Sequence, residues 1–196
     1  MNPRRLSQAI SEGDGISVIV EVDGPDAALD AEDGGADALL VPGAAATSLP
    51  SIRGTTDLPI LARFGERAGA DALEGADACV VDVRDDDRER LRAVQHELAD
   101  RFELAVRIET EDHLEFVLEE FDPEILVLAA SAAGGHSPLE RVLELLPDVP
   151  AGKLAIADIG AGTRDEVDEL ERAGMDGVIV AAGDVAHLVD AAPPEV

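Results

Sequence analysis

The sequence contains no tryptophan, no tyrosine, four phenylalanines and one cysteine. A hydrophobic core must therefore be built from Val, Ile, Leu and Ala. The single cysteine, Cys79, excludes an intramolecular disulfide and a cysteine-based metal site, and its position inside an apolar run indicates a small buried hydrophobe. No apolar run reaches the roughly 20 residues of a membrane span, and the first residues lack an apolar stretch of signal-peptide length. We therefore expect a soluble, cytoplasmic protein with no membrane partner.

Lysine is almost absent as well. Lys153 is the only one, so arginine supplies nearly all of the positive charge, and 15 basic residues against 43 acidic ones give a formal net charge of −28. This charge repels a phosphate backbone, so we expect no nucleic-acid partner. The acids are spread over the predicted helices, which indicates adaptation to a halophilic cytosol, where molar salt screens repulsion within about 3 Å. An acidic surface that recruits a basic partner is the alternative.

Eight short apolar runs recur along the chain, separated by acidic segments with helical spacing. Near-continuous apolar runs are typical of parallel strands that are covered on both faces. Eight such strand-then-helix units in 196 residues predict an α/β fold, a minimal (β/α)8 TIM barrel in a single domain. A doubly wound open sheet is the alternative, although the sequence has no glycine-rich nucleotide loop. The predicted strands are 17–22, 37–41, 58–62, 78–83, 104–108, 124–128, 154–157 and 177–180.

A phrase of the type Gly-Ala-Asp precedes three of the predicted strands, at 34–38, 74–78 and 173–177. The glycine is expected to end a helix, and the small residues let the next strand pack closely. Thr163 and Glu166 form a capping-box pair that predicts the start of a helix. These patterns indicate the fold and not the chemistry. The chain is accordingly divided into a short N-terminal lead-in, the barrel and a frayed tail, over 1–15, 16–190 and 191–196.

Active sites of this fold lie where the strands end, at the C-terminal face of the barrel. Arg63 and Arg107 are expected at the ends of the third and fifth strands, where they can converge with Glu21 and Asp82. Two interpretations stay open: a pocket for an anionic small molecule, or an internal ion-pair network. Carboxylates at this face can also ligate a divalent cation, but no spacing motif supports a metal site and we predict none. The carboxylates concerned are Asp23, Asp82, Glu109 and Asp158.

The four histidines are dispersed, and their spacing does not indicate a zinc site. His136 stands apart, because it lies in a loop of small residues after the sixth predicted strand, at the catalytic face. We retain His136 as a candidate ligand-binding residue on a flexible lid.

Several segments, taken in order, resemble the indole-3-glycerol-phosphate synthase family of phosphate-binding TIM barrels. The first predicted strand contains Glu21, as the family's first strand carries a glutamate, and a Leu-Pro-Ile-Leu strand occupies 58–61. The resemblance covers nearly the whole chain. The segments that carry it are 5–10, 17–22, 34–41, 48–53, 57–61, 158–163 and 173–180.

The resemblance implies a carbon–carbon lyase of tryptophan biosynthesis that closes a pyrrole ring on an anthranilate-derived substrate, with loss of carbon dioxide and water and without a cofactor. By position, the family's catalytic residues correspond to Glu21, Arg63, Arg107 and Asp158. Arg63 replaces the lysine that serves as general acid, and an arginine with a pKa above about 12 does not readily exchange a proton near neutral pH. Arg107 replaces a glutamate.

The family's phosphate contacts correspond to Gly160, Gly162, Ala182 and Gly183, without the hydroxyl groups that the family places there. Backbone N–H groups near Gly183 can still bind an anion. The family also has an N-terminal helical extension, whereas about 15 residues precede the first strand here. Apolar surface left bare by its absence leads us to expect a homo-oligomer.

We therefore predict a diverged, synthase-like pseudoenzyme that binds an anionic small molecule or a protein partner. The alternative is an active synthase with a rearranged site in which Glu21 and Arg63 carry the catalysis.

Overall fold

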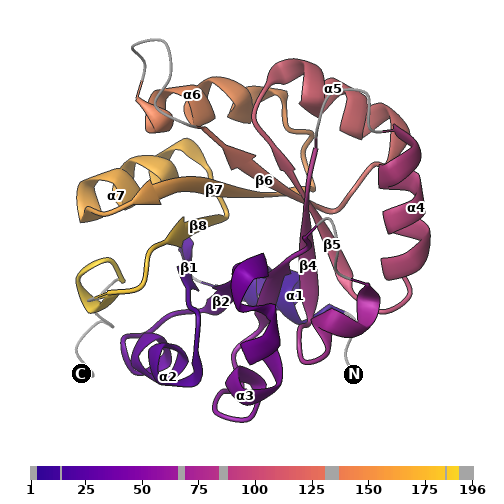
Figure 1. Cartoon of the computed structure of the whole chain (residues 1–196). Helices are drawn as coiled ribbons and strands as arrows, with labels where there is room; N and C mark the ends of the chain where they lie inside the picture. The colour runs from indigo at the N-terminus through magenta and orange to yellow at the C-terminus, as the bar shows by residue number, and fades with distance from the viewer. Residues whose placement is uncertain are drawn as a thin grey trace.

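Eight parallel strands close into a barrel, in chain order, in the computed structural model (Figure 1). The structure describes residues 4–13, 15–65, 69–83, 88–130, 137–183 and 185–189. Because β1 pairs with β8, the sheet is closed, which confirms the (β/α)8 barrel and excludes the open sheet. The strands are β1 (Ser17–Glu21), β2 (Ala38–Val41), β3 (Ile60–Arg63), β4 (Ala78–Asp82), β5 (Glu103–Ile108), β6 (Ile125–Ala129), β7 (Leu154–Ala161) and β8 (Gly177–Val180).

Helices surround the barrel, and 3-10 turns stand beside or in place of some of them. Within the described residues, the connection from β3 to β4 has only the turn η2, and β8 is followed only by η4. The predicted capping box is confirmed: Thr163 precedes the first turn of α7 and exchanges hydrogen bonds with Glu166. The helical elements are α1 (Arg5–Glu12), α2 (Pro25–Asp33), η1 (Gly43–Ser48), α3 (Leu49–Arg53), η2 (Ala70–Leu73), α4 (Arg88–Leu98), α5 (Glu111–Glu120), α6 (Pro138–Leu145), η3 (Leu146–Asp148), α7 (Arg164–Ala173) and η4 (Val185–His187).

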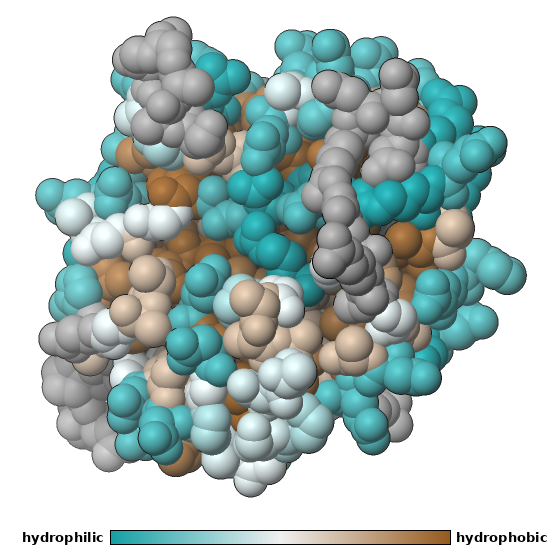
Figure 2. Space-filling view, in the orientation of Figure 1, coloured by the Kyte–Doolittle hydropathy of each residue, from teal (hydrophilic) through white to brown (hydrophobic). Residues whose placement is uncertain are grey.

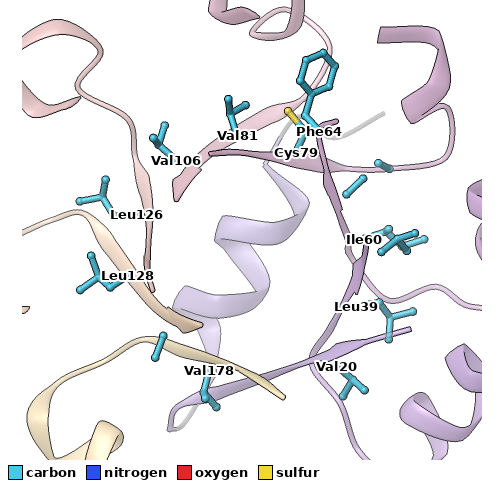
Figure 3. Close-up of a cluster of buried hydrophobic side chains, with 14 of the residues drawn as sticks. Val20, Leu39, Ile60, Phe64, Cys79, Val81, Val106, Leu126, Leu128 and Val178 are labelled. Atoms are coloured by element: carbon cyan, nitrogen blue, oxygen red, sulfur yellow. The ribbon is translucent and has the colours of Figure 1, made fainter. Parts of the chain in front are cut away.

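The strands are buried on both faces, which explains their near-continuous apolar runs. Side chains such as Val20, Leu39 and Val178 point out of the ring toward the helices (Figure 3). Alternate side chains, such as Ile19 and Leu40, form a second cluster inside the barrel. The core is aliphatic, as the composition predicts.

The segment before β1 folds into α1, which lies across one end of the ring of strands (Figure 1). Leu6 and Ile10 of this helix are buried in the cluster inside the barrel. The Glu103 carboxylate accepts the backbone N–H groups of Leu6 (2.7 Å) and Ser7 (3.1 Å), at the helix end where such groups have no partner in the helix itself. Helix α1 therefore seals the N-terminal end of the barrel.

The repeated aspartate of the Gly-Ala-Asp phrase joins neighbouring strands. Each of these aspartates donates its backbone N–H to one residue of the preceding strand and accepts that residue's N–H on its carboxylate, over 2.7–3.0 Å. The preceding glycines have positive φ angles of 87° to 102°, a conformation that side chains disfavour. The phrase thus serves the fold, as predicted. The pairs are Asp37 with Val18, Asp77 with Ile60 and Asp176 with Ala155.

Asp77 also forms ion pairs, in addition to the hydrogen bonds described for all three aspartates. Its carboxylate is 1% exposed and forms ion pairs with Arg5 (3.1 Å) and Arg53 (2.6 Å). Arg53 also donates to the backbone carbonyls of Gly75, Thr56 and Leu58. This network ties α1, α3 and the start of β4 together at the N-terminal end.

The described surface is mostly polar. Leu29, at 43% exposure, is the one large hydrophobic side chain with high exposure in the described part of the chain. Self-association therefore stays a prediction without a visible apolar patch to support it. Within the same residues, no helix combines the length and the apolar character needed to span a membrane.

Replacing Asp77 by alanine is expected to lower the free energy of unfolding by about 3 kcal/mol, because two partly buried guanidinium groups lose their counter-charge. Chemical denaturation in molar KCl measures the change. The control is Asp71→Ala, which removes a 99% exposed carboxylate that pairs with Arg101 and should leave the midpoint unchanged. Equal effects of the two substitutions would contradict the role assigned to Asp77.

Burial raises the pKa of the Cys79 thiol to about 12, so the reactive thiolate is scarce at neutral pH. We expect a thiol-specific reagent to leave the native protein unlabelled and to label it fully after denaturation. Rapid labelling of the native protein, at the rate of a free cysteine, would show that Cys79 is accessible.

Candidate functional site

Charged side chains replace apolar ones at the last inward-facing position of several strands. Successive strand residues point to opposite faces, so a residue two places beyond a barrel-lining residue also points inward. Figure 2, in the view of Figure 1, shows hydrophilic side chains near the centre of the face opposite α1. The residues at these positions are Glu21, Arg63, Asp82, Arg107 and Asp158, which follow the lining residues Ile19, Leu61, Val80, Ala105 and Ile156.

Four of these side chains, Arg63, Asp82, Arg107 and Asp158, form one network, here called the charged quartet. Asp158 Oδ2 accepts from Arg63 Nη2 at 3.0 Å and from Arg107 Nε at 2.8 Å. Asp82 Oδ1 lies 3.9 Å from Arg63 Nη1 and 3.7 Å from Arg107 Nη1, which is ion-pair distance but too long for a hydrogen bond. The four side chains are 17–29% exposed and their formal charges cancel.

The strand order explains these contacts. Asp82 and Arg107 are register neighbours on β4 and β5, whereas Arg63 on β3 reaches across the barrel to Asp158 on β7. Strand β7 has a register shift just after Asp158, and Gly160 in that irregularity has a φ of 64°. The bulge ends regular pairing at the charged position, as bulges beside functional sites often do.

Arg107 is held from two sides. Besides Asp158, it contacts Glu109 through Nη1 at 2.5 Å. Burial by itself lowers the pKa of the Arg107 guanidinium, but hydrogen bonds to Asp158 and Glu109 outweigh it and raise the pKa. Arg107 therefore stays cationic and can bind an anion, but it does not supply a proton.

Glu21 does not join the quartet. Its side chain is exposed at the end of β1, and it forms no ion pair with the other described residues. The expected convergence of Arg63 and Arg107 therefore includes Asp82, as predicted, but takes Asp158 in the place expected for Glu21. The internal ion-pair network, one of the two sequence interpretations, is present.

A second carboxylate, that of Glu166 in the first turn of α7, is bound to the loop that precedes this helix. Glu166 Oε2 accepts the backbone N–H groups of Gly162 (3.0 Å) and Thr163 (3.1 Å) and the Thr163 hydroxyl (2.9 Å). The hydrogen bond from Gly162 is the main cause of the lowered pKa of Glu166. His187 Nε2 lies 3.5 Å from the Gly162 carbonyl. Of the residues expected to contact phosphate, Gly162 thus donates its N–H to the protein's own carboxylate.

The other candidate ligand residues have few contacts. Gly160, Ala182 and Gly183 are exposed, and the space where a side chain of Gly160 or Gly183 would start is open. His136 lies outside the described residues. In the described ranges no three His, Cys, Asp or Glu side chains are grouped as a metal ion would require.

Sequence reasoning gave too little weight to Asp82, Glu109 and Glu166. The signal for Asp82 was its place two residues after the inward-facing Val80. Glu166 was recognised as a helix cap, but its contact with Gly162 depends on the path of the loop.

The fold and this face define a (β/α)8 barrel with a charged C-terminal end. No protein-family model matches the chain. At the level of sequence it is similar to an indole-3-glycerol phosphate synthase of Variovorax paradoxus (strain S110), with 30% identity over 144 residues, which covers 67% of this chain and 52% of that protein. The chain thus spans about half the length of this relative.

Solved structures share the fold at 16% sequence identity. A protein of Aquifex aeolicus VF5 matches with a TM-score of 0.69 over 94% of this chain and 97% of its own. The N-acetylmannosamine-6-phosphate 2-epimerase of Clostridium perfringens matches at 0.66 (87% and 88%), and the thiamine phosphate pyrophosphorylase of Pyrococcus furiosus at 0.63 (88% and 90%). These similarities establish the barrel and leave the chemistry open.

A double-mutant cycle on Arg63 and Asp158 tests the quartet. Asp158→Asn is expected to lower the free energy of unfolding by about 1–2 kcal/mol, because two half-buried guanidinium groups lose a shared acceptor. Adding Arg63→Gln should restore part of the loss, with a coupling of about 1 kcal/mol, measured by denaturation in molar KCl. The control cycle on the exposed pair Arg101 and Asp71 should show no coupling. Zero coupling within the quartet would mean that its contacts add nothing to stability.

Proposed function

We propose that this protein is a diverged, synthase-like barrel that binds a small carboxylate-bearing molecule at the charged quartet and does not catalyse the synthase reaction. The observation that supports this most directly is the convergence of Arg63 and Arg107 on one carboxylate oxygen of Asp158. A carboxylate from solution would make the same contacts, because guanidinium groups recognise any carboxylate through the same planar donors.

The quartet is accessible enough for exchange. Its side chains keep 17–29% of their surface exposed, so a ligand can reach the arginines without unfolding a strand. The carboxylate of the ligand would replace that of Asp158 as the partner of the two arginines. Because replacing one carboxylate by another contributes little binding free energy, the affinity must come from additional contacts at the same face.

Two features argue against the synthase reaction. The position that the resemblance assigns to a general acid carries Arg63, whose guanidinium does not release a proton near neutral pH. The loop N–H groups at the expected phosphate position are bound to Glu166. A phosphorylated substrate would have to displace that carboxylate.

An active indole-3-glycerol phosphate synthase is the second candidate. It is favoured by the 30% identity to the Variovorax paradoxus enzyme. It is also favoured by Glu21, an exposed carboxylate at the same barrel end as Arg63, with no ion-pair partner among the described residues. In that case Glu21 would move a proton and Arg63 would stabilise developing negative charge.

One set of assays separates the two candidates. The wild type is incubated in molar KCl with the synthase's anthranilate-derived, phosphorylated substrate, and indole-3-glycerol phosphate is measured. In parallel, thermal shift measures stabilisation by a panel of small carboxylates. We expect no product, and a stabilisation that is lost in Arg63→Gln and kept in Arg101→Gln, which changes an exposed arginine away from the quartet.

Product that forms with the wild type and disappears with Arg63→Gln would overturn the binding proposal and favour the active synthase. Absence of both product and stabilisation would overturn both small-molecule functions and direct the search to protein partners.

A further inference from the structure

In the described part of the chain, the charged end of the barrel has more carboxylates than cations. Within the described residues, the inward positions of β1, β4 and β7 and the exposed Glu109 supply four acids, whereas Arg63 and Arg107 supply two cations. Arg90 lies nearby and donates to the backbone carbonyl of Asp82 at 3.5 Å; with Arg90 counted, these four acids still exceed the three cations. A simple anion that binds the two arginines would therefore enter a region with an excess of negative charge.

One acceptor in this region lacks a hydrogen-bond donor. Asp82 Oδ1 is buried and receives no hydrogen bond in the structure, although two guanidinium groups lie 3.7 and 3.9 Å away. A buried carboxylate oxygen that receives no hydrogen bond is costly, because ion pairs at this distance replace its lost water only in part. A ligand that displaces Asp158 would open this oxygen to a donor of its own.

The position of a bound carboxylate and the Asp82 oxygen without a donor lie next to the same guanidinium group, that of Arg63. Arg63 uses Nη2 to hold the carboxylate of Asp158 and turns Nη1 toward Asp82 Oδ1. A molecule whose carboxylate replaces that of Asp158 can therefore place a group on the adjacent carbon next to Asp82. A cationic donor at that place would both satisfy the orphaned oxygen and offset the excess of negative charge.

We propose that the ligand of the charged quartet is an α-amino acid, with its carboxylate on Arg63 and Arg107 and its ammonium group on Asp82. This inference rests on the proposed function and narrows it from carboxylates in general to zwitterions. Asp82 is in this sense the specificity-determining residue, and the arginines supply the anchor.

The test compares matched pairs of ligands by isothermal titration calorimetry at neutral pH in molar KCl. Each α-amino acid is paired with the carboxylate that lacks its amino group: alanine with propionate, phenylalanine with 3-phenylpropionate, and aspartate with succinate. We expect at least one amino acid to bind about tenfold more tightly than its partner, which corresponds to about 1.4 kcal/mol. Ethylamine alone should not bind.

Asp82→Asn isolates the contribution of the acid, because asparagine keeps the shape and an acceptor oxygen but removes the charge. This variant should abolish the preference for the amino acid and strengthen binding of the plain carboxylate, because a negative charge beside the two arginines is removed. Asp100→Asn, a change of an exposed acid in the turn between α4 and β5, should keep the preference. Circular dichroism confirms that each variant is folded.

The outcomes distinguish the two proposals. Equal binding of the amino acid and the plain carboxylate would overturn the inference and leave the proposed function standing. A preference that persists in Asp82→Asn would also overturn the inference, because another group would then hold the ammonium. Failure of all these carboxylates, with and without an amino group, to bind would overturn the proposed function together with the inference.

Discussion

In the closed barrel, successive side chains of every strand point alternately outward and inward, and the rest of the structure depends on that constraint. One set of alternate side chains must face the helices and the other must face the barrel axis, where buried side chains fill the interior. Aliphatic residues fill most of both sets between Ser17 and Glu103 at the N-terminal end and the charged positions at the C-terminal end. Charged residues at the last inward position are accommodated either by pairing with one another, as in the charged quartet, or by exposure to solvent, as for Glu21.

The same constraint explains how much could be predicted. Runs buried on both faces revealed the strands and, with their number and spacing, the barrel. The end of β7 was missed, since the predicted strand stops at 157 and the observed one continues through a bulge to Ala161. Bulges follow from local pairing across strands, which a single sequence does not display. The role of α1 was also missed, because the Glu103 carboxylate that caps it lies almost a hundred residues away.

At the candidate site, the position of each charged residue on its strand could be predicted from the sequence, but the ion pairs that it forms could not. The strand ends placed Arg63, Arg107 and Asp82 at one face, and the structure joins them. The shared partner Asp158 stands on the opposite side of the barrel from Arg63, so its contact depends on the barrel diameter and on the reach of an arginine side chain. Glu21 has the right position on β1 but a shorter side chain, and it remains outside the network.

The carboxylates of Asp158 and Glu166 have one feature in common, which is that each is bound to hydrogen-bond donors of the protein itself. Asp158 is bound to Arg63 and Arg107, and Glu166 is bound to the N–H groups of Gly162 and Thr163, so two of the groups of donors that could hold an anion at this face are already bound to carboxylates of the protein. Both are direct, hydrogen-bonded contacts. If the net charge of −28 is an adaptation to molar salt, attraction over more than about 3 Å is screened, and only contacts of this kind discriminate between ligands. Recognition at the quartet must then depend on which ligand atoms touch Arg63, Arg107 and Asp82, since the long-range field of an acidic protein contributes little under those conditions.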